Sequence, residues 1–287
     1  INAPNQSSHR AIYTLFQWLS LDVVLGALFS GMMVAQILEI EMPIYWYWVL
    51  PLSVWVIYTT DHLMDARRLK DAAHTPRHLF HYRYFRLLGT LWAIGLGTCL
   101  LYVPFLIDEQ MFRFGIGMGI LVLGHLALVW LIGDRIAWFL HKELGVALIY
   151  SAGVWGAPMV LCAHPIPVWC WILAGQFFML AILNLLLFSL YEWESDTLDQ
   201  HTSFVRGIGR KAAKRLCWSI SALIIGLGIW IAILDPTINW PLLQLVYTLM
   251  LTGLLWLLMD EDRFRFAERY RLLGDGVFLL PIIPLLG

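Results

Sequence analysis

Residues 167–191 read PVWCWILAGQFFMLAILNLLLFSLY, without a single charged side chain. A helix needs about 20 apolar residues to cross the hydrocarbon core of a bilayer. A run of this length and composition is typical of a transmembrane helix, because the helix satisfies every backbone polar group internally. This run therefore predicts that at least part of the chain lies in lipid.

The composition extends this prediction to the whole chain. Of its 287 residues, 60% are hydrophobic and 14% are charged, whereas a soluble domain has about 25% charged residues. A water-soluble enzyme, a nucleic-acid-binding protein and a disordered protein are therefore excluded, and the formal net charge of -1 gives no reason to expect a nucleic-acid partner. The four cysteines form no C-x-x-C motif, so neither a zinc site nor a redox pair is indicated.

Similar apolar runs recur along the chain, with no internal repeat and no soluble domain between them. We expect an all-α integral membrane protein in which residues 1–287 form a single transmembrane domain of nine helices. The predicted spans are 11–37, 44–66, 87–107, 112–132, 143–163, 167–191, 213–234, 240–259 and 271–286.

The basic residues predict an orientation. Eighteen of the 19 lysines and arginines fall in the N-terminal segment and in the loops after the second, fourth, sixth and eighth spans, and only Arg113 lies in the opposite loops. By the positive-inside rule, the basic segments face the cytoplasm. The N-terminus is therefore expected to be cytoplasmic, in an inner, plasma or organellar membrane.

Two acidic clusters stand at the predicted cytoplasmic ends of spans two and six. Asp61 and Asp65 end the second span, and Glu192 and Asp196 end the sixth, followed by Asp199. Each pair has i, i+4 spacing, which places both carboxylates on one face if the helix is continuous. Acids at helix ends are often ordinary solvated residues, but two clusters of matching spacing and side favour a shared site.

Carboxylates that face each other need a cation between them, and Mg²⁺ commonly bridges a few carboxylates to substrate phosphates. Basic residues that could bind the same phosphates lie nearby: Arg67, Arg68, Lys70, Arg77, Lys142, Arg206 and Arg210. A diphosphate on a lipid tail suits such a site, with its head at the cytoplasmic rim and its chain among the helices.

These segments resemble the UbiA superfamily of intramembrane prenyltransferases. That superfamily has nine transmembrane helices and two Asp-rich motifs, approximately N-D-x-x-D-x-x-x-D and D-x-x-D-x-x-x-D, which lie on its second and sixth helices and bind Mg²⁺ and an isoprenyl diphosphate. The resemblance is carried by the residues from Tyr191 to Gly209 and by Lys142-Glu143-Leu144-Gly145. Both clusters depart from the motifs at the leading acid, where this chain has Ile57-Tyr58 and Ser189.

The resemblance implies Mg²⁺-dependent transfer of a prenyl group from an isoprenyl diphosphate to a small, aromatic or quinone-like acceptor within the membrane. The catalytic and metal-binding residues that it implies are Asp61, Asp65, Glu192 and Asp196. The expected substrate-binding residues are Arg67, Arg68, Lys142, Asp199, Arg206, Tyr58 and Tyr191. Aromatic faces stabilise carbocations, and the candidates by position are Tyr58, Tyr150, Trp155, Tyr191 and Trp193.

Three alternatives remain open at this point. An intramembrane terpene cyclase would use the same scaffold without an acceptor. A non-catalytic subunit would bind a quinone, pigment or lipid in a larger membrane complex, and the missing leading acids favour it. A secondary transporter would use Asp22, Asn184 and Asp275, although the acids concentrate at one membrane face and not at the midplane.

Overall fold

The computed structural model describes residues 13–69, 76–132, 141–198, 203–234, 240–265 and 268–286, and every regular element in these ranges is a helix. The first half contains α2 (Leu21–Ile37), α3 (Trp46–Leu69), α4 (Pro76–Arg83), α5 (Phe85–Gly97), the π-helix η2 (Thr98–Tyr102), the 3-10 helix η3 (Val103–Phe105), α6 (Glu109–Ile132) and α7 (His141–Leu161). The second half contains α8 (Val168–Tyr191), α9 (Trp193–Leu198), α10 (Phe204–Ile208), α11 (Arg210–Leu234), α12 (Trp240–Met259), α13 (Glu261–Arg265), α14 (Arg269–Gly276) and the 3-10 helix η6 (Val277–Leu286).

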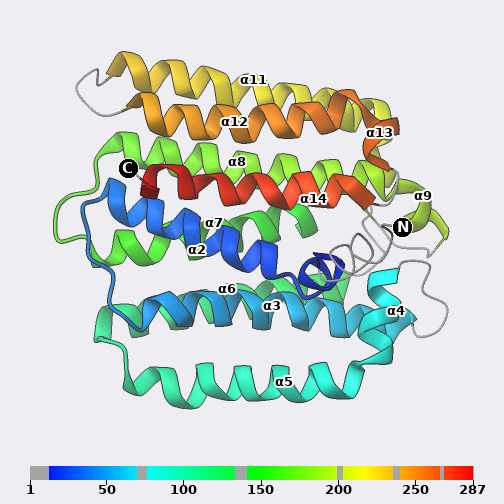
Figure 1. The fold of residues 1–287 in the computed structure, drawn as a ribbon, viewed down its shortest axis with the longest axis horizontal. Coiled ribbons are helices and arrows are strands. Elements are labelled where there is room, and N and C mark those ends of the chain that lie inside the picture. The colour runs from blue at the N-terminus through cyan, green and yellow to red at the C-terminus, as the bar shows by residue number, and fades with distance from the viewer. Residues whose placement is uncertain are drawn as a thin grey trace, which may run out of the picture.

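The long helices lie side by side with nearly parallel axes (Figure 1). The apolar helix α8 packs against α7, α11 and α12, while α2 packs against α3, α7 and η6, and α5 covers α3 from outside. The short helices α4, α9 and α13 gather at one end of the bundle, on the right in Figure 1. These contacts bring the C-terminal ends of α3 and α8 to the same end of the molecule.

The core is built around α8. Its largest fully buried side chains are Leu173, Phe177, Leu180, Leu183, Leu186, Leu187 and Leu190. They recur at intervals of one to four residues, because α7, α11 and α12 enclose α8 on several sides. The outer helices differ, since large apolar side chains on α5, α6 and α11 are exposed.

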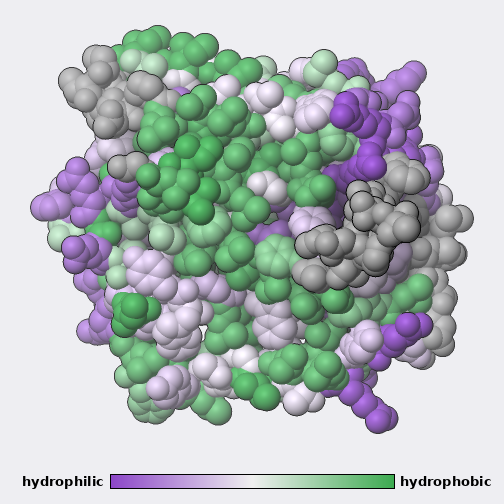
Figure 2. All heavy atoms as spheres, viewed as in Figure 1, coloured by the Kyte–Doolittle hydropathy of each residue, from purple (hydrophilic) through white to green (hydrophobic). Residues whose placement is uncertain are grey.

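This exposed apolar surface fits a lipid environment. Within the described ranges, six helices are long and apolar enough to cross a membrane, and α2 is a shorter apolar helix. On the face shown in Figure 2, hydrophobic residues cover the middle of the molecule and hydrophilic residues gather towards its two ends. The chain is therefore a multi-pass membrane protein, whereas the count of nine spans and the cytoplasmic N-terminus stay predictions.

Some of the predicted spans are not continuous α-helices. The stretch 11–37 is interrupted at Ser20, which adopts the left-handed conformation (φ 56°) immediately before α2. The stretch 271–286 is α14 followed by the 3-10 helix η6, which contains Pro281 and Pro284. Proline lacks the N–H that an α-helix needs and clashes with the preceding turn, so the final segment winds more tightly than predicted.

Candidate functional site

A polar cavity of about 210 Å³ opens among α2, α3, α7, α8 and α14, at the end of the bundle where α3 and α8 finish. Among the described residues, six carboxylates and three lysine or arginine side chains line it: Asp22, Asp61, Asp65, Glu143, Glu192 and Asp275, with Arg77, Lys142 and Arg271. Apolar and aromatic residues complete its wall, among them Val146, Ala147, Leu185, Phe188 and Phe278. The cavity therefore combines a charged lining with an apolar one, as a ligand with an ionic head and an apolar tail requires.

The first acidic cluster has the geometry that its spacing predicts. Asp61 and Asp65 both lie in the continuous helix α3, one turn apart, and both line the cavity. Tyr58, one turn before Asp61, lines it as well. Helix α4 packs against α3, and its His78 Nε2 lies 3.8 Å from a carboxylate oxygen of Asp65.

The second acidic cluster differs from the prediction. Helix α8 ends at Tyr191, Glu192 is its C-cap residue, and Asp196 belongs to the separate helix α9. The expectation that Glu192 and Asp196 share one face of a continuous helix is therefore wrong. Glu192 lines the cavity, whereas the Asp196 side chain and the whole of Asp199 lie outside the described part of the structure.

The Glu192 carboxylate is held by two residues near the start of α14. Its Oε1 accepts hydrogen bonds from the Arg271 guanidinium and, at 3.1 Å, from the Tyr270 hydroxyl. Arg271 in turn lies over the rings of Phe188 and Tyr270, with 5.4 and 5.5 Å to their centroids. The first acid of this cluster, Glu192, is thus paired with an arginine.

The predicted phosphate-binding residues separate into two groups. Lys142 and Arg77 line the cavity. Burial and the nearby charge of Arg271 both lower the pKa of Arg77, so an anion in the cavity would stabilise its charged form. Arg67 and Arg206 are not among the residues that line the cavity, and the side chain of Arg68 lies outside the described residues.

Ser189 occupies the place where the second motif has its leading acid, and it points to another carboxylate. Its hydroxyl donates a hydrogen bond of 3.0 Å to Glu143 Oε1 of α7. The same carboxylate oxygen accepts a hydrogen bond from the backbone N–H of Phe204, which starts α10. Glu143 therefore ties together α7, α8 and α10 beside the cavity, and these hydrogen bonds compensate for the burial of its carboxylate.

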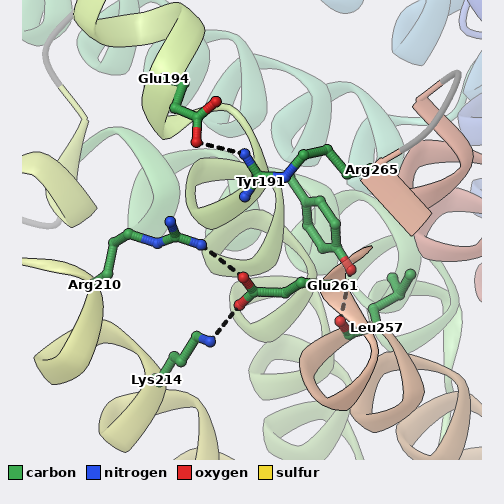
Figure 3. A network of polar contacts seen from close by, with 7 residues as sticks. All are labelled: Tyr191, Glu194, Arg210, Lys214, Leu257, Glu261 and Arg265. Carbon is green, nitrogen blue, oxygen red and sulfur yellow. Dashed lines mark hydrogen bonds and ion pairs between the residues drawn. The ribbon is translucent and has the colours of Figure 1, made fainter. Parts of the chain in front are cut away.

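Tyr191, which was expected to bind substrate, is not among the residues that line the cavity and instead contacts neighbouring helices. Its hydroxyl donates to the backbone carbonyl of Leu257 at 2.7 Å, and its ring stacks on Tyr270. Figure 3 shows it beside ion pairs that join the ends of the surrounding helices: Glu261 with Arg210 and Lys214, and Glu194 with Arg265. These contacts fix the ends of α8, α11 and α12 next to the cavity.

The inner end of the cavity is polar too. Asp22 on α2 and Asp275 on α14 line it together with Asn184 of α8, whose Nδ2 donates to Asp275 Oδ1 at 3.4 Å. Asn184 Oδ1 and the Tyr150 hydroxyl have no hydrogen-bond partner among the described residues.

The donor set suits a metal ion only in part. Within the described ranges, no three histidine, cysteine, aspartate or glutamate side chains are close enough together to hold a metal ion by themselves. Asp61 and Asp65 nevertheless offer two carboxylates from one helix face, and Mg²⁺ is commonly bound by one or two carboxylates with phosphate oxygens and water as its other ligands. These two residues fit such an ion, whereas Glu192 already forms an ion pair with Arg271.

Sequence reasoning did not single out Arg271. By its position it is one of the basic residues of the loop after the eighth predicted span, although Asp275 follows it by four residues at the start of an apolar segment. A pair of opposite charges one turn apart in such a place is costly in lipid unless both face the interior. The i, i+4 spacing of Arg271 and Asp275 is therefore the sequence pattern that indicates an interior position for Arg271.

Comparison with known proteins gives a fold. No protein-family model matches the chain, and no curated protein sequence matches it significantly. Among solved structures, it is similar to a UbiA homolog from Archaeoglobus fulgidus, with a TM-score of 0.57 and 14% identity over 93% of this chain and 92% of that one. The chain has a UbiA fold. The predicted resemblance is thereby confirmed at the level of the fold, and the UbiA fold extends over nearly the whole chain.

Proposed function

We propose that the chain is a UbiA-type prenyltransferase, which transfers a prenyl group from an isoprenyl diphosphate to a small, aromatic or quinone-like acceptor in the membrane. The observation that carries the proposal is the cavity itself. It brings Asp61 and Asp65 of α3, Glu192 of α8 and the basic residues Arg77 and Lys142 together within a UbiA fold.

The charges of the lining predict a need for a divalent cation. Among the described residues of the cavity wall, carboxylates outnumber the lysine and arginine side chains, so an isolated diphosphate would be repelled. Asp61 and Asp65 would hold Mg²⁺, and Asp196 stays a predicted further ligand. The bound ion would neutralise charge on the departing diphosphate.

The other residues would bind and position the substrate. Arg77 and Lys142 would hold phosphate oxygens by charge-assisted hydrogen bonds. The ring of Tyr58, one turn from Asp61, would face the allylic carbon as the C–O bond to the diphosphate breaks, because aromatic faces stabilise cations. The apolar wall around Ala147 and Leu185 would take the prenyl chain and exclude water until the acceptor attacks.

The proposal is tested by the binding of geranyl, farnesyl and geranylgeranyl diphosphates to the purified protein, with and without Mg²⁺. We expect saturable, Mg²⁺-dependent binding that weakens more than about tenfold in Asp61→Asn and Asp65→Asn, because each loses one charged contact. Asp108→Asn is the matched control, since Asp108 is exposed in the loop between η3 and α6, outside the cavity wall.

Two outcomes would overturn the proposal. If the wild type and the Asp61 and Asp65 variants bound the diphosphates equally well, a metal site at these two residues would be excluded. No binding of any chain length to the folded protein would leave the non-catalytic alternative, in which the UbiA fold holds a quinone, pigment or lipid in a membrane complex.

A further inference from the structure

Arg271 is a fixed cation in the cavity wall. It lies in the first turn of α14, its side chain is only 15% exposed, and its guanidinium faces the rings of Phe188 and Tyr270. Contacts with the carboxylates of Glu192 and Glu268 hold it from two sides. A side chain restrained in this way presents its charge at one place in the cavity.

Glu192 is already compensated by that cation. The Glu192 side chain is 23% exposed, and its Oε1 receives hydrogen bonds from both Arg271 and Tyr270. To bind a metal ion through this oxygen, Glu192 would have to release the guanidinium. Such a release would leave a partly buried charge without its partner, which is costly.

The guanidinium suits the ligand of the proposed function. It has five N–H donors in a planar fork that matches phosphate oxygens. The contacts with Glu192 and Glu268 engage only part of this fork. Arg271 also lines the same cavity as Asp61 and Asp65, so one diphosphate can lie between the two sides.

We infer that Arg271 binds the diphosphate directly and takes the place of a metal ion on the side of the second acidic cluster. Glu192 is then a positioning residue, which holds the guanidinium and does not ligate metal. The site binds a single divalent cation, at Asp61 and Asp65, and the arginine supplies the second positive centre. This inference rests on the proposed function and names how its diphosphate is held.

The decisive variants are Glu192→Gln and Arg271→Gln, because a metal-binding Glu192 and an arginine-holding Glu192 give different results. The probe is farnesyl thiodiphosphate, a slowly reacting analogue, and the readout is its Kd in Mg²⁺ by calorimetry. We expect Arg271→Gln to weaken binding about tenfold or more, the loss of one charge-assisted contact. Glu192→Gln should leave the Kd within about threefold of the wild type or tighten it, because the amide oxygen still accepts a hydrogen bond from Arg271 while the negative charge that competes with the phosphate for the guanidinium is removed.

Arg265→Gln is the matched control. Arg265 also forms an ion pair with a glutamate, Glu194, but it is not part of the cavity wall. Its Kd should equal that of the wild type. Thermal unfolding of each variant separates loss of the fold from loss of binding, and if Arg271→Gln does not fold, Glu192→Gln still decides the question.

A second readout counts the metal ions. Mn²⁺ can replace Mg²⁺, and its electron paramagnetic resonance signal reports the free ion. We expect one Mn²⁺ bound per chain with the analogue present, and two would overturn the inference. A loss of binding in Glu192→Gln as large as that in Asp61→Asn would overturn it as well.

The two proposals can fail separately. If the wild type binds neither the analogue nor any of the three isoprenyl diphosphates, the proposed function fails. If the wild type binds it and Asp61→Asn does not, while Arg271→Gln binds like the wild type, only the role of Arg271 is wrong.

Discussion

Asp275 is a half-buried acid near the inner end of the cavity. It shares this space with Asp22, a second carboxylate, and accepts a hydrogen bond from Asn184. Like charges in a medium of low polarity repel, so the ionised pair destabilises the fold. We expect Asp275→Asn to preserve or raise the melting temperature, because it removes a charge and keeps the acceptor oxygen.

Asp275→Ala is the comparison for that variant. It leaves the Asn184 amide without its acceptor, and we expect it to lower the free energy of unfolding by about 1–3 kcal/mol. Thermal unfolding in detergent micelles measures both changes. A larger loss in Asp275→Asn than in Asp275→Ala would contradict this account and show that the charge itself is needed.

His81 predicts a dependence of stability on pH. This buried residue of α4 is 2% exposed, and its Nδ1 lies 2.9 Å from the Arg77 carbonyl oxygen. Burial lowers its pKa, and the positive charge of Arg77 acts in the same direction. The unfolded chain therefore binds a proton near pH 6.5 that the folded chain does not, and the stability from His81 is lost as the pH falls below that value.

The measurement is the melting temperature between pH 7.5 and 5.5. The acid-induced decrease should be smaller in His81→Gln than in the wild type, because the glutamine does not titrate. His164→Gln is the control, since His164 is exposed and its replacement should leave the slope unchanged. An equal slope in His81→Gln would exclude His81 as a source of the effect.

At the scale of the elements, α6 and α7 approach closely at two glycines of α7. A Cβ added at Gly145 would lie 2.2 Å from Nδ1 of His125, and one added at Gly156 would lie 2.4 Å from the ring of Phe114. Gly145 belongs to the segment that carries Lys142 and Glu143 into the cavity wall. The small residue therefore lets α7 lie close enough to α6 for these side chains to be placed.

Gly145→Ala should destabilise the protein by about 1–3 kcal/mol, because the contact must widen. Gly153→Ala in the same helix is the control, since its Cβ would meet only Met118, at 3.9 Å. Removing a glycine from a helix interior stabilises it by about 0.5–1 kcal/mol, so Gly153→Ala should raise the melting temperature. Equal effects of the two variants would mean that the α6–α7 contact is loose.

At the scale of the whole molecule, the basic loops predict which end of the bundle faces the cytoplasm. Arg83 ends α4 at the end where α9 and α13 also lie, and Glu109 starts α6 (Figure 1). Both residues are exposed. In a background without the native cysteines, Arg83→Cys should react with a membrane-impermeant maleimide only after the membrane is opened, whereas Glu109→Cys should react from outside. The reverse pattern would invert the predicted orientation.

The sequence alone determined the class of the molecule and the approximate positions of its long apolar helices. Long uncharged runs such as 167–191 specify membrane-embedded helices, because lipid leaves the backbone no other partner than itself. The spacing of Asp61 and Asp65 likewise determined their common face, since both lie within one continuous helix. These features are local, and a local pattern is sufficient to predict them.

Only the tertiary structure decided which residues surround the second acidic cluster. Helix α8 ends just before Glu192, and the residues around Glu192 do not predict this end. They also do not predict that Arg271, 79 residues later in the chain, pairs with Glu192. Ser189, with Glu143 from another helix beside it, is a second case. Periodicity assigns a residue to a face of its own helix, but the partner of a buried charge is set by which distant helix packs against that face.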